Sequence, residues 1–405
     1  MKNRQLIFFS FFMFHTIFVY LDDGSGIGRK IQVGCLSIMS IYVFQNIKVL
    51  FDYHFKRFNI AILLFCITLL ITSISIKDLV IGPDYQSSSY TLGIFHALSL
   101  IMFLVFFESV VIKKQIDIVL NTFFWLLFFY CIATDLFLLA GIHSFPEGFL
   151  IGNKFIVSYS HIFCVVLYCI KDRSKRINPY FTNSPKVYLF IAFSALICIL
   201  SQTATGLIGS VIVFLLFKFK KVVKKTLFNS HLIITFLFIF TTISFIFIEL
   251  INNEFIQYFI VNILGKDLTL TGRLDIYDVL LDMLTKRPVT GFGSGNAHYA
   301  LRYYYGMANA QNGFFNVIFE QGILGATALV YLLYVSFRNL RNFGAYPLVA
   351  FIIMYIVLSS VEVTLGMNFI YLLIILQMFT FSNHKFEFYI DYIYNNKNYK
   401  IVSNQ

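Results

Sequence analysis

The chain has 405 residues, of which 59% are hydrophobic and only 13% are charged, and its mean hydropathy is +0.78. A soluble domain carries about a quarter charged residues, because its surface needs polar cover. This composition therefore excludes a soluble globular chain and indicates an all-α, polytopic integral membrane protein. The net charge of +11 is expected to come from basic cytoplasmic loops rather than from nucleic-acid binding, since no basic stripe lies on a polar face.

The six cysteines all lie in apolar runs, and none forms a CxxC pair. We therefore expect buried thiols rather than disulfides or metal ligands. The 50 phenylalanines are expected mainly to face lipid. The N-terminal segment has a basic start and an apolar run but no small-residue cleavage site, so it is expected to remain as a first transmembrane helix rather than to be removed as a signal peptide.

Apolar runs near the length that a transmembrane helix needs, about 20 residues, recur along the whole chain. The predicted spans are residues 5–21, 31–50, 58–76, 92–112, 118–140, 155–170, 186–203, 205–218, 231–250, 314–337, 346–363 and 366–382. The seventh and eighth are separated by almost no loop, only SQTATG, which predicts a tight hairpin.

Basic residues support this even number of spans. With the N-terminus in the cytoplasm, 22 of the 31 Lys and Arg residues fall in cytoplasmic segments and nine fall outside. Because Lys and Arg gather on the cytoplasmic side of membrane proteins, both termini are expected to be cytoplasmic.

The predicted organisation has four parts. Residues 1–250 form an N-terminal transmembrane bundle of about nine spans, and residues 251–313 form a large outer loop with short helices. Residues 314–382 form about three C-terminal transmembrane helices, and residues 383–405 form a cytoplasmic tail. Loops as long as 251–313 usually carry function in compact proteins, so we place the candidate active site there.

Within this loop, the sequence predicts an amphipathic helix from about Gly272 to Lys286, which Thr271 can cap and Pro288 ends. Arg273 falls in the middle of its apolar face. A guanidinium on an apolar surface is costly unless an anion pairs with it, and its fork suits a phosphate. The alternative is that Arg273, at the helix start, extends into water.

The residues that follow carry two further signals. The glycines of GFGSG, Gly291 to Gly295, allow backbone N–H groups to turn toward an anion, although a plain flexible turn is the default interpretation of this segment alone. His298 and Arg302 lie four residues apart and share one face of a helix. The tyrosines of RYYY suit sugar stacking or anchoring at the membrane interface.

Asn312 opens the next apolar helix, in which Glu320 is the lone acid. A carboxylate in apolar surroundings can serve as a general base. The alternative is a structural hydrogen bond at a helix break near Gly322 and Gly325.

Other polar residues in or near the spans are interpreted as helix-packing groups, since most lie near the outer end of a span. They are Asp135, Glu362, His15, His96 and His161. No His and carboxylate set has metal-ligand spacing, so no metal is expected.

The motifs of this loop occur in a fixed order: TGR with Arg273, RP with Pro288, GFGSG, QNGFF with Asn312, and EQGILG from Glu320 to Gly325. In that order and spacing they resemble the O-antigen ligase/Wzy-type polymerase superfamily of bacterial inner-membrane proteins. The layout of many spans with a large late periplasmic loop extends the resemblance along most of the chain.

Two departures from the family pattern matter. Ligases of the superfamily usually have His just before this Asn, where the chain has Gln311. An earlier Ser-Arg is replaced by the stretch from Ser201 to Gly206, which has no Arg. The first departure argues against ligation to lipid A-core.

The resemblance implies a GT-C-like membrane glycosyltransferase with both termini in the cytoplasm. It would polymerise undecaprenyl-diphosphate-linked oligosaccharide repeat units into O-antigen, capsular or exopolysaccharide, without a cofactor or a required metal. Glu320, with His298 second, would be the base. The candidates for binding diphosphate or glycan are Arg273, Arg287, Arg302, Gln311, Asn312, Gly291 and Gly293. The expected partners are the lipid-linked glycans, the bilayer, and a chain-length regulator and flippase of the same pathway.

Two alternatives remain at this point. One is an O-antigen ligase, and the other is a flippase for lipid-linked oligosaccharide. Twelve spans suit a transporter, but such proteins tend to show repeated halves, and the sequence shows no repeat.

Overall fold

The computed structural model describes residues 3–18, 27–51, 56–77, 89–141, 150–172, 181–250, 254–258, 273–307, 309–338, 340 and 343–377. The predicted tail 383–405 and most of 251–272 lie outside these residues. Within some helices the backbone alone is described, and Arg273 is one such position.

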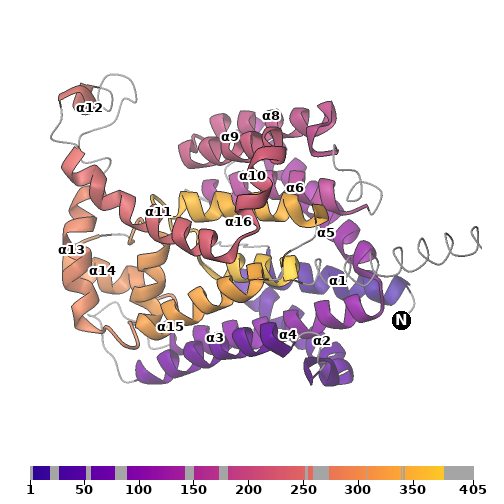
Figure 1. The fold of residues 1–405 in the computed structure, drawn as a ribbon. Coiled ribbons are helices and arrows are strands. Elements are labelled where there is room, and N and C mark those ends of the chain that lie inside the picture. Colours follow the sequence, from indigo (N-terminus) through magenta and orange to yellow (C-terminus); the bar gives the residue numbers. More distant parts are fainter. Residues whose placement is uncertain are drawn as a thin grey trace, which may run out of the picture.

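Helices form the described part of the chain (Figure 1). The first half contains α1 (Asn3–Ile17), α2 (Ile27–Asn46), α3 (Lys56–Ser75), α4 (Ser89–Ile112), α5 (Ile116–Leu139) and α6 (Lys154–Ile170). The second half contains α8 (Pro185–Leu200), α9 (Ala204–Lys218), α10 (Lys220–Leu227), α11 (Ser230–Leu250), α12 (Glu254–Tyr258), α13 (Arg273–Lys286), α14 (Ala297–Tyr305), α15 (Gly313–Arg338) and α16 (Tyr346–Leu358). A last helix spans Met367–Gln377. Short 3₁₀ turns lie at Ile47–Phe51, Phe181–Asn183 and Phe343–Ala345.

A helix occupies each of the twelve predicted spans. Five described helices are long and apolar enough to cross a membrane. They are Gly28–Phe51, Lys56–Ser75, Thr91–Ile112, Ile116–Leu139 and Gly313–Arg338. Several others are apolar but have 17 residues or fewer. The structure therefore agrees with a polytopic membrane protein, while the number of crossings stays a prediction.

Contacts at the two ends of the bundle fit helices that alternate in direction. At one end, Arg287, which follows α13, reaches the carbonyl of Ser75, where α3 ends. At the other end, Lys113 bonds Asn46 across α4 and α2. Helices α13 and α14 lie at one end of the bundle, and the N-terminus lies at the opposite end (Figure 1). About nine spans are predicted between the N-terminus and α13, and an odd number of spans places the two at opposite ends of the bundle.

Local sequence signals set several helix boundaries. Asn153 caps α6, since its side-chain oxygen accepts the N–H groups of Phe155 and Ile156 at 3.1 and 3.0 Å. Pro185 occupies the first turn of α8, where a missing N–H costs nothing. The link between α8 and α9 is three residues long, with Gln202 at a φ of 54°. The predicted tight hairpin is therefore confirmed.

Helix α16 lies at the centre of the bundle and packs against α6, α9 and α11. Nearly all its side chains are buried, as expected for a helix that is apolar all round. The expectation that phenylalanine mainly faces lipid is wrong in part, because Phe makes up most of the largest fully buried side chains. Composition alone cannot tell a core ring from one at the lipid surface. The six cysteines are buried and free, as predicted.

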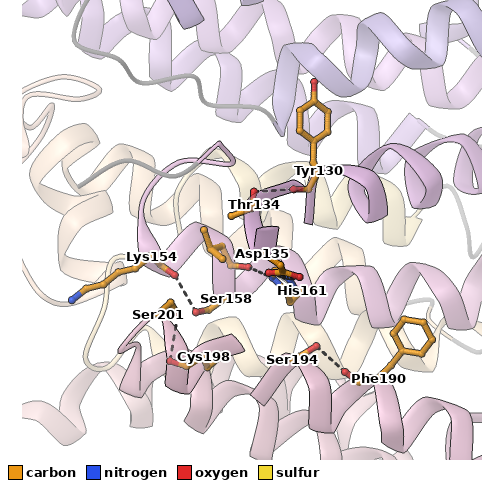
Figure 2. A network of polar contacts seen from close by, with 11 residues as sticks. Tyr130, Thr134, Asp135, Lys154, Ser158, His161, Phe190, Ser194, Cys198 and Ser201 are labelled. Carbon is orange, nitrogen blue, oxygen red and sulfur yellow. Dashed lines mark hydrogen bonds and ion pairs between the residues drawn. The ribbon is translucent and has the colours of Figure 1, made fainter. Parts of the chain in front are cut away.

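Polar pairs between the spans join neighbouring helices. His161 of α6 lies 3.1 Å from a carboxylate oxygen of Asp135 on α5 (Figure 2). Its Nδ1 lies 2.8 Å from the Val157 carbonyl, which can only accept, so Nδ1 carries a proton and Nε2 faces Asp135. On the other side of α5, His15 bonds the Tyr130 hydroxyl at 2.8 Å. The predicted packing role of these residues is confirmed.

Candidate active site

Helix α13 forms as predicted and begins at Arg273. Its described buried side chains are Ile276 and Met283, two turns apart on one face. The Arg273 side chain lies outside the described residues, so its predicted anion contact stays a prediction. Thr271, the predicted cap, lies outside them as well.

Helix α13 is joined to α14 through its polar face. The Tyr305 hydroxyl donates to the Asp282 carboxylate. Lys286 lies 4.6 Å above the ring of Tyr304 and 3.9 Å from Asp282. Tyr304 and Tyr305 therefore hold the two short helices together.

The GFGSG segment pairs with a break in α15. The helix departs from helical geometry at Gly322, so carbonyls before the break and N–H groups after it lack their usual partners. Phe292 N–H donates to the Phe319 carbonyl at 2.6 Å, and Gly293 N–H donates to the Glu320 carbonyl at 2.8 Å. In return, Ile323 N–H reaches the Pro288 carbonyl at 2.8 Å.

Two glycines make this approach possible. A Cβ on Gly291 would lie 2.5 Å from the Phe319 carbonyl oxygen, and one on Gly322 would lie 2.1 Å from that of Val289. Both glycines also have left-handed φ angles, +64° and +63°, which side chains disfavour. The break in α15 and the loop that fills it therefore depend on both glycines.

This pairing corrects the role suggested for the loop glycines. The N–H of Gly291 donates to the Arg287 carbonyl, and that of Gly293 to the Glu320 carbonyl. Neither is free to bind a diphosphate as predicted. The loop does present one N–H to an anion, because Gly295 donates to the Glu320 carboxylate.

A cavity of about 450 Å³ opens beside this loop, within the 300–1,000 Å³ typical of ligand pockets. Its polar walls contain two acids, two histidines and five carboxamides. These are Glu320, Glu362, His96, His298, Asn153, Asn309, Asn316, Gln321 and Asn368. Its aromatic walls are Phe65, Phe155, Tyr159 and Tyr355. The cavity thus combines the GFGSG loop with residues of α3, α4, α6, α14, α15 and α16 and of the segment after α16.

Gly295 positions the two predicted catalytic residues. Its N–H donates to Glu320, which also accepts from the Asn316 side chain. Its carbonyl accepts from the His298 ring. Burial and, to a lesser degree, the nearby Arg302 charge lower the pKa of His298 below its usual 6.5, so the ring is neutral at pH 7. A neutral imidazole and a carboxylate in one cavity can both accept protons.

Four other residues that were predicted to bind diphosphate or glycan do not line the cavity. They are Arg287, Arg302, Gln311 and Asn312. Arg287 Nη2 donates to the Ser75 carbonyl at 3.1 Å and anchors the loop to α3. Arg302 lies exposed on α14, within electrostatic range of His298. Gln311 has a left-handed φ of 47° and donates its N–H to Asn309.

Asn312 is buried and caps α15. Its Oδ1 accepts the N–H groups of Phe314 and Phe315 at 3.1 and 3.2 Å, and its Nδ2 donates to the Thr241 carbonyl. Its side chain therefore serves the start of the helix rather than the glycan contact that was predicted for it.

Sequence reasoning did not place His96, Ser294 or Glu362 in the site. His96 Nδ1 lies 3.1 Å from the Ser294 hydroxyl, which joins α4 to the loop. Glu362 lies after α16 and lines the cavity. Ser294 lies within GFGSG, but His96 and Glu362 belong to no local motif and were interpreted as helix-packing groups.

Residues 189–330 match the family model described as O-antigen ligase. This region runs from α8 into α15 and contains every motif of the predicted pattern from Arg273 to Gly325. No curated protein and no solved structure matches the chain. The order of the motifs and the family match over residues 189–330 support the O-antigen ligase/polymerase superfamily.

Proposed function

We propose that the chain polymerises undecaprenyl-diphosphate-linked oligosaccharide repeat units at the periplasmic face of the bacterial inner membrane, as a GT-C-like glycosyltransferase. The observation that carries this proposal is the cavity shared by Glu320 and His298, both bonded to Gly295. The reaction needs a proton acceptor beside a space for sugars, and this cavity supplies both.

In the proposed reaction, a hydroxyl of the acceptor's terminal sugar attacks the anomeric carbon of the donor glycan. A new carbon–oxygen bond forms, and the bond from that carbon to undecaprenyl diphosphate breaks. The bonding electron pair leaves with the diphosphate, and the hydroxyl proton passes to Glu320. The hydrogen bonds from Gly295 and Asn316 hold this carboxylate in place, which favours attack from a fixed geometry. His298 is the second candidate for the base.

The leaving diphosphate needs positive charge where its own charge develops. Arg273 is proposed for this role, with Arg302 as helper. Arg302 lies near His298, and α13 is held to α14 through Asp282 and Tyr305. Guanidinium groups at the start of α13 and on α14 would thus belong to one connected outer layer. The reaction as proposed requires neither a nucleotide sugar nor a metal.

Ligases of the superfamily usually have His at the position of Gln311. This difference favours a polymerase over a lipid A-core ligase. Whether the product is O-antigen, capsule or exopolysaccharide depends on the other enzymes of its pathway. A chain-length regulator and a flippase are its proposed partners.

Gel analysis of surface polysaccharide from a deletion strain tests this proposal. Loss of a polymerase leaves core capped by single repeat units. Bare core would instead identify a ligase, and a block in export would identify a flippase. Either of those two patterns overturns the polymerase assignment.

A further inference from the structure

His96 of α4 lines the cavity but has no part in the reaction described so far. Its Nδ1 lies 3.1 Å from the hydroxyl of Ser294, a residue 198 positions further along the chain. Either atom can donate, so the bond forms with either tautomer of a neutral imidazole. Ser294 lines the cavity as well and is only 2% exposed. A buried bond between such distant segments places the GFGSG loop relative to α4.

The part of α4 that carries His96 is itself held in place. The Ser99 hydroxyl donates to the His96 carbonyl at 2.9 Å. Its one proton is thereby used, so its oxygen accepts from the Tyr371 hydroxyl at 2.7 Å. Tyr371 lies on the last helix, Met367–Gln377. His96 thus joins the loop, through its side chain, to the last helix, through its backbone.

The loop makes a tight turn at the point where α4 contacts it. Asn296 N–H donates to the Gly293 carbonyl at 3.1 Å, which makes Ser294 and Gly295 the two central residues of the turn. Gly295 has a left-handed φ of +78°, and a Cβ there would lie 2.5 Å from Leu92 Cδ2. Leu92 lies one turn before the histidine on α4, so one face of this helix contacts both central residues.

The peptide unit between Ser294 and Gly295 carries the N–H that donates to the Glu320 carboxylate. This unit is planar and rigid, so a displacement of Ser294 moves the N–H with it. Gly295 has no side chain that could hold its own position. The bond between His96 and Ser294 therefore supplies a side-chain anchor one residue away from the donor.

We propose that His96 is a positioning residue for the proposed base: through Ser294 it holds the Gly295 N–H against the Glu320 carboxylate. This inference rests on the proposed function and adds to it a residue that acts through two others. Without the bond, Glu320 would lose its fixed direction toward the acceptor hydroxyl, and a misplacement of about 1 Å can cost about 10²-fold in rate. The other walls of the cavity would stay in place, so the loss should fall on kcat rather than on KM.

Chain extension by the purified full chain in lipid nanodiscs tests this role, with lipid-linked single units extracted from the deletion strain as substrate. His96→Leu removes the bond and should lower kcat roughly tenfold or more, with KM little changed. Ser294→Ala should do the same. His96→Asn places a polar atom where Nδ1 stands and should keep most of the rate. His96→Gln, the matched control, carries the same carboxamide one carbon further out and should not.

The amide proton of Gly295 reports the same geometry without any substrate. Cell-free synthesis with Ser labelled by ¹³C at its carbonyl and Gly labelled by ¹⁵N selects the two Ser–Gly pairs of the chain in an NMR spectrum. Ser294→Ala removes one of the two signals and so assigns it. Hydrogen bonds to a carboxylate are short, which shifts the proton downfield. His96→Leu should move this signal upfield, toward its position in Glu320→Gln, and His96→Asn should leave it near that of the wild type.

Wild-type kcat in both His96→Leu and Ser294→Ala overturns the inference. An unmoved Gly295 signal in His96→Leu overturns it at any rate, because the effect would then not pass through this N–H. Equal rescue by Asn and Gln at position 96 also contradicts it, since only Asn reproduces Nδ1. Absence of chain extension by the wild type refutes the proposed function instead, and the Gly295 signal then decides whether His96 positions this N–H.

Discussion

Gly295 connects two titratable side chains that the sequence separates by 22 positions, His298 and Glu320. Its N–H serves Glu320 and its carbonyl serves His298, so one residue contacts both side chains. This arrangement explains why a glycine-rich turn can form part of a reactive site.

The charge of Arg302 should set the pH range of activity through His298. Burial first, and Arg302 second, lower the pKa of this histidine. Arg302→Gln removes one cause and raises that pKa toward 6.5, so His298 becomes protonated at a higher pH as the solution is acidified. If the neutral ring is needed, the acid limb of the activity profile should move to higher pH.

Arg302→Lys keeps the charge and is the matched control, whose profile should stay near that of the wild type. The measurement is chain extension against pH, with each variant normalised to its own maximum. Identical profile shapes for Arg302→Gln and the wild type would remove His298 from the reaction.

At the scale of elements, the pairing of residues 288–293 with α15 is the feature on which the site depends. It satisfies backbone groups that the break at Gly322 would leave without partners. Glu320 lies two residues before this break and accepts from Gly295 N–H, so the helix interruption lies at the site.

Gly322→Ala should therefore be more harmful than the same change at another left-handed glycine. Gly306 has a φ of +69° but no atom within 4 Å of an added Cβ, so Gly306→Ala carries only the backbone strain, of about 1–2 kcal/mol. At Gly322 the Cβ also meets the Val289 backbone. We expect a further loss of roughly 1–3 kcal/mol, seen as a lower melting temperature of the purified protein in detergent. Equal melting temperatures for the two variants would show that the loop does not approach α15 this closely.

The contact between α5 and α6 gives a second prediction at this scale. Asp135→Ala leaves His161 buried without its partner and should cost about 3–5 kcal/mol. Asp135→Asn keeps a polar side chain of the same size opposite Nε2 and should cost less. Thermal melting of both variants measures the difference, and a stable Asp135→Ala protein would mean that the pair contributes little.

Across the whole molecule, the span positions followed from the sequence because apolar length is a local property. The amphipathic pattern that ends at Pro288 likewise predicted α13, and Asn312 predicted the start of α15. The cavity did not follow, because Glu362 and His96 reach it only through packing of distant helices. The loop glycines were misassigned for a related reason, since the partner of their N–H groups is a helix break that periodicity does not reveal.

The orientation of the bundle in the membrane can be measured with thiol labelling, since all six native cysteines are buried. Tyr303 on α14 is 56% exposed, and Asp172 lies at the opposite end of the bundle. In intact spheroplasts, a membrane-impermeant maleimide should label Tyr303→Cys and not Asp172→Cys. Permeabilised membranes should allow both. Labelling of Asp172→Cys alone would place the candidate site in the cytoplasm.

The most direct measurement is the chain length of surface polysaccharide in cells whose only copy carries Glu320→Gln. This change keeps the size and polarity of the side chain and removes the proton-accepting charge. With the variant present in the membrane at normal level, we expect single repeat units, as in the deletion strain. Polymer of wild-type length from that variant would contradict the assignment of Glu320 and the chemistry built on it.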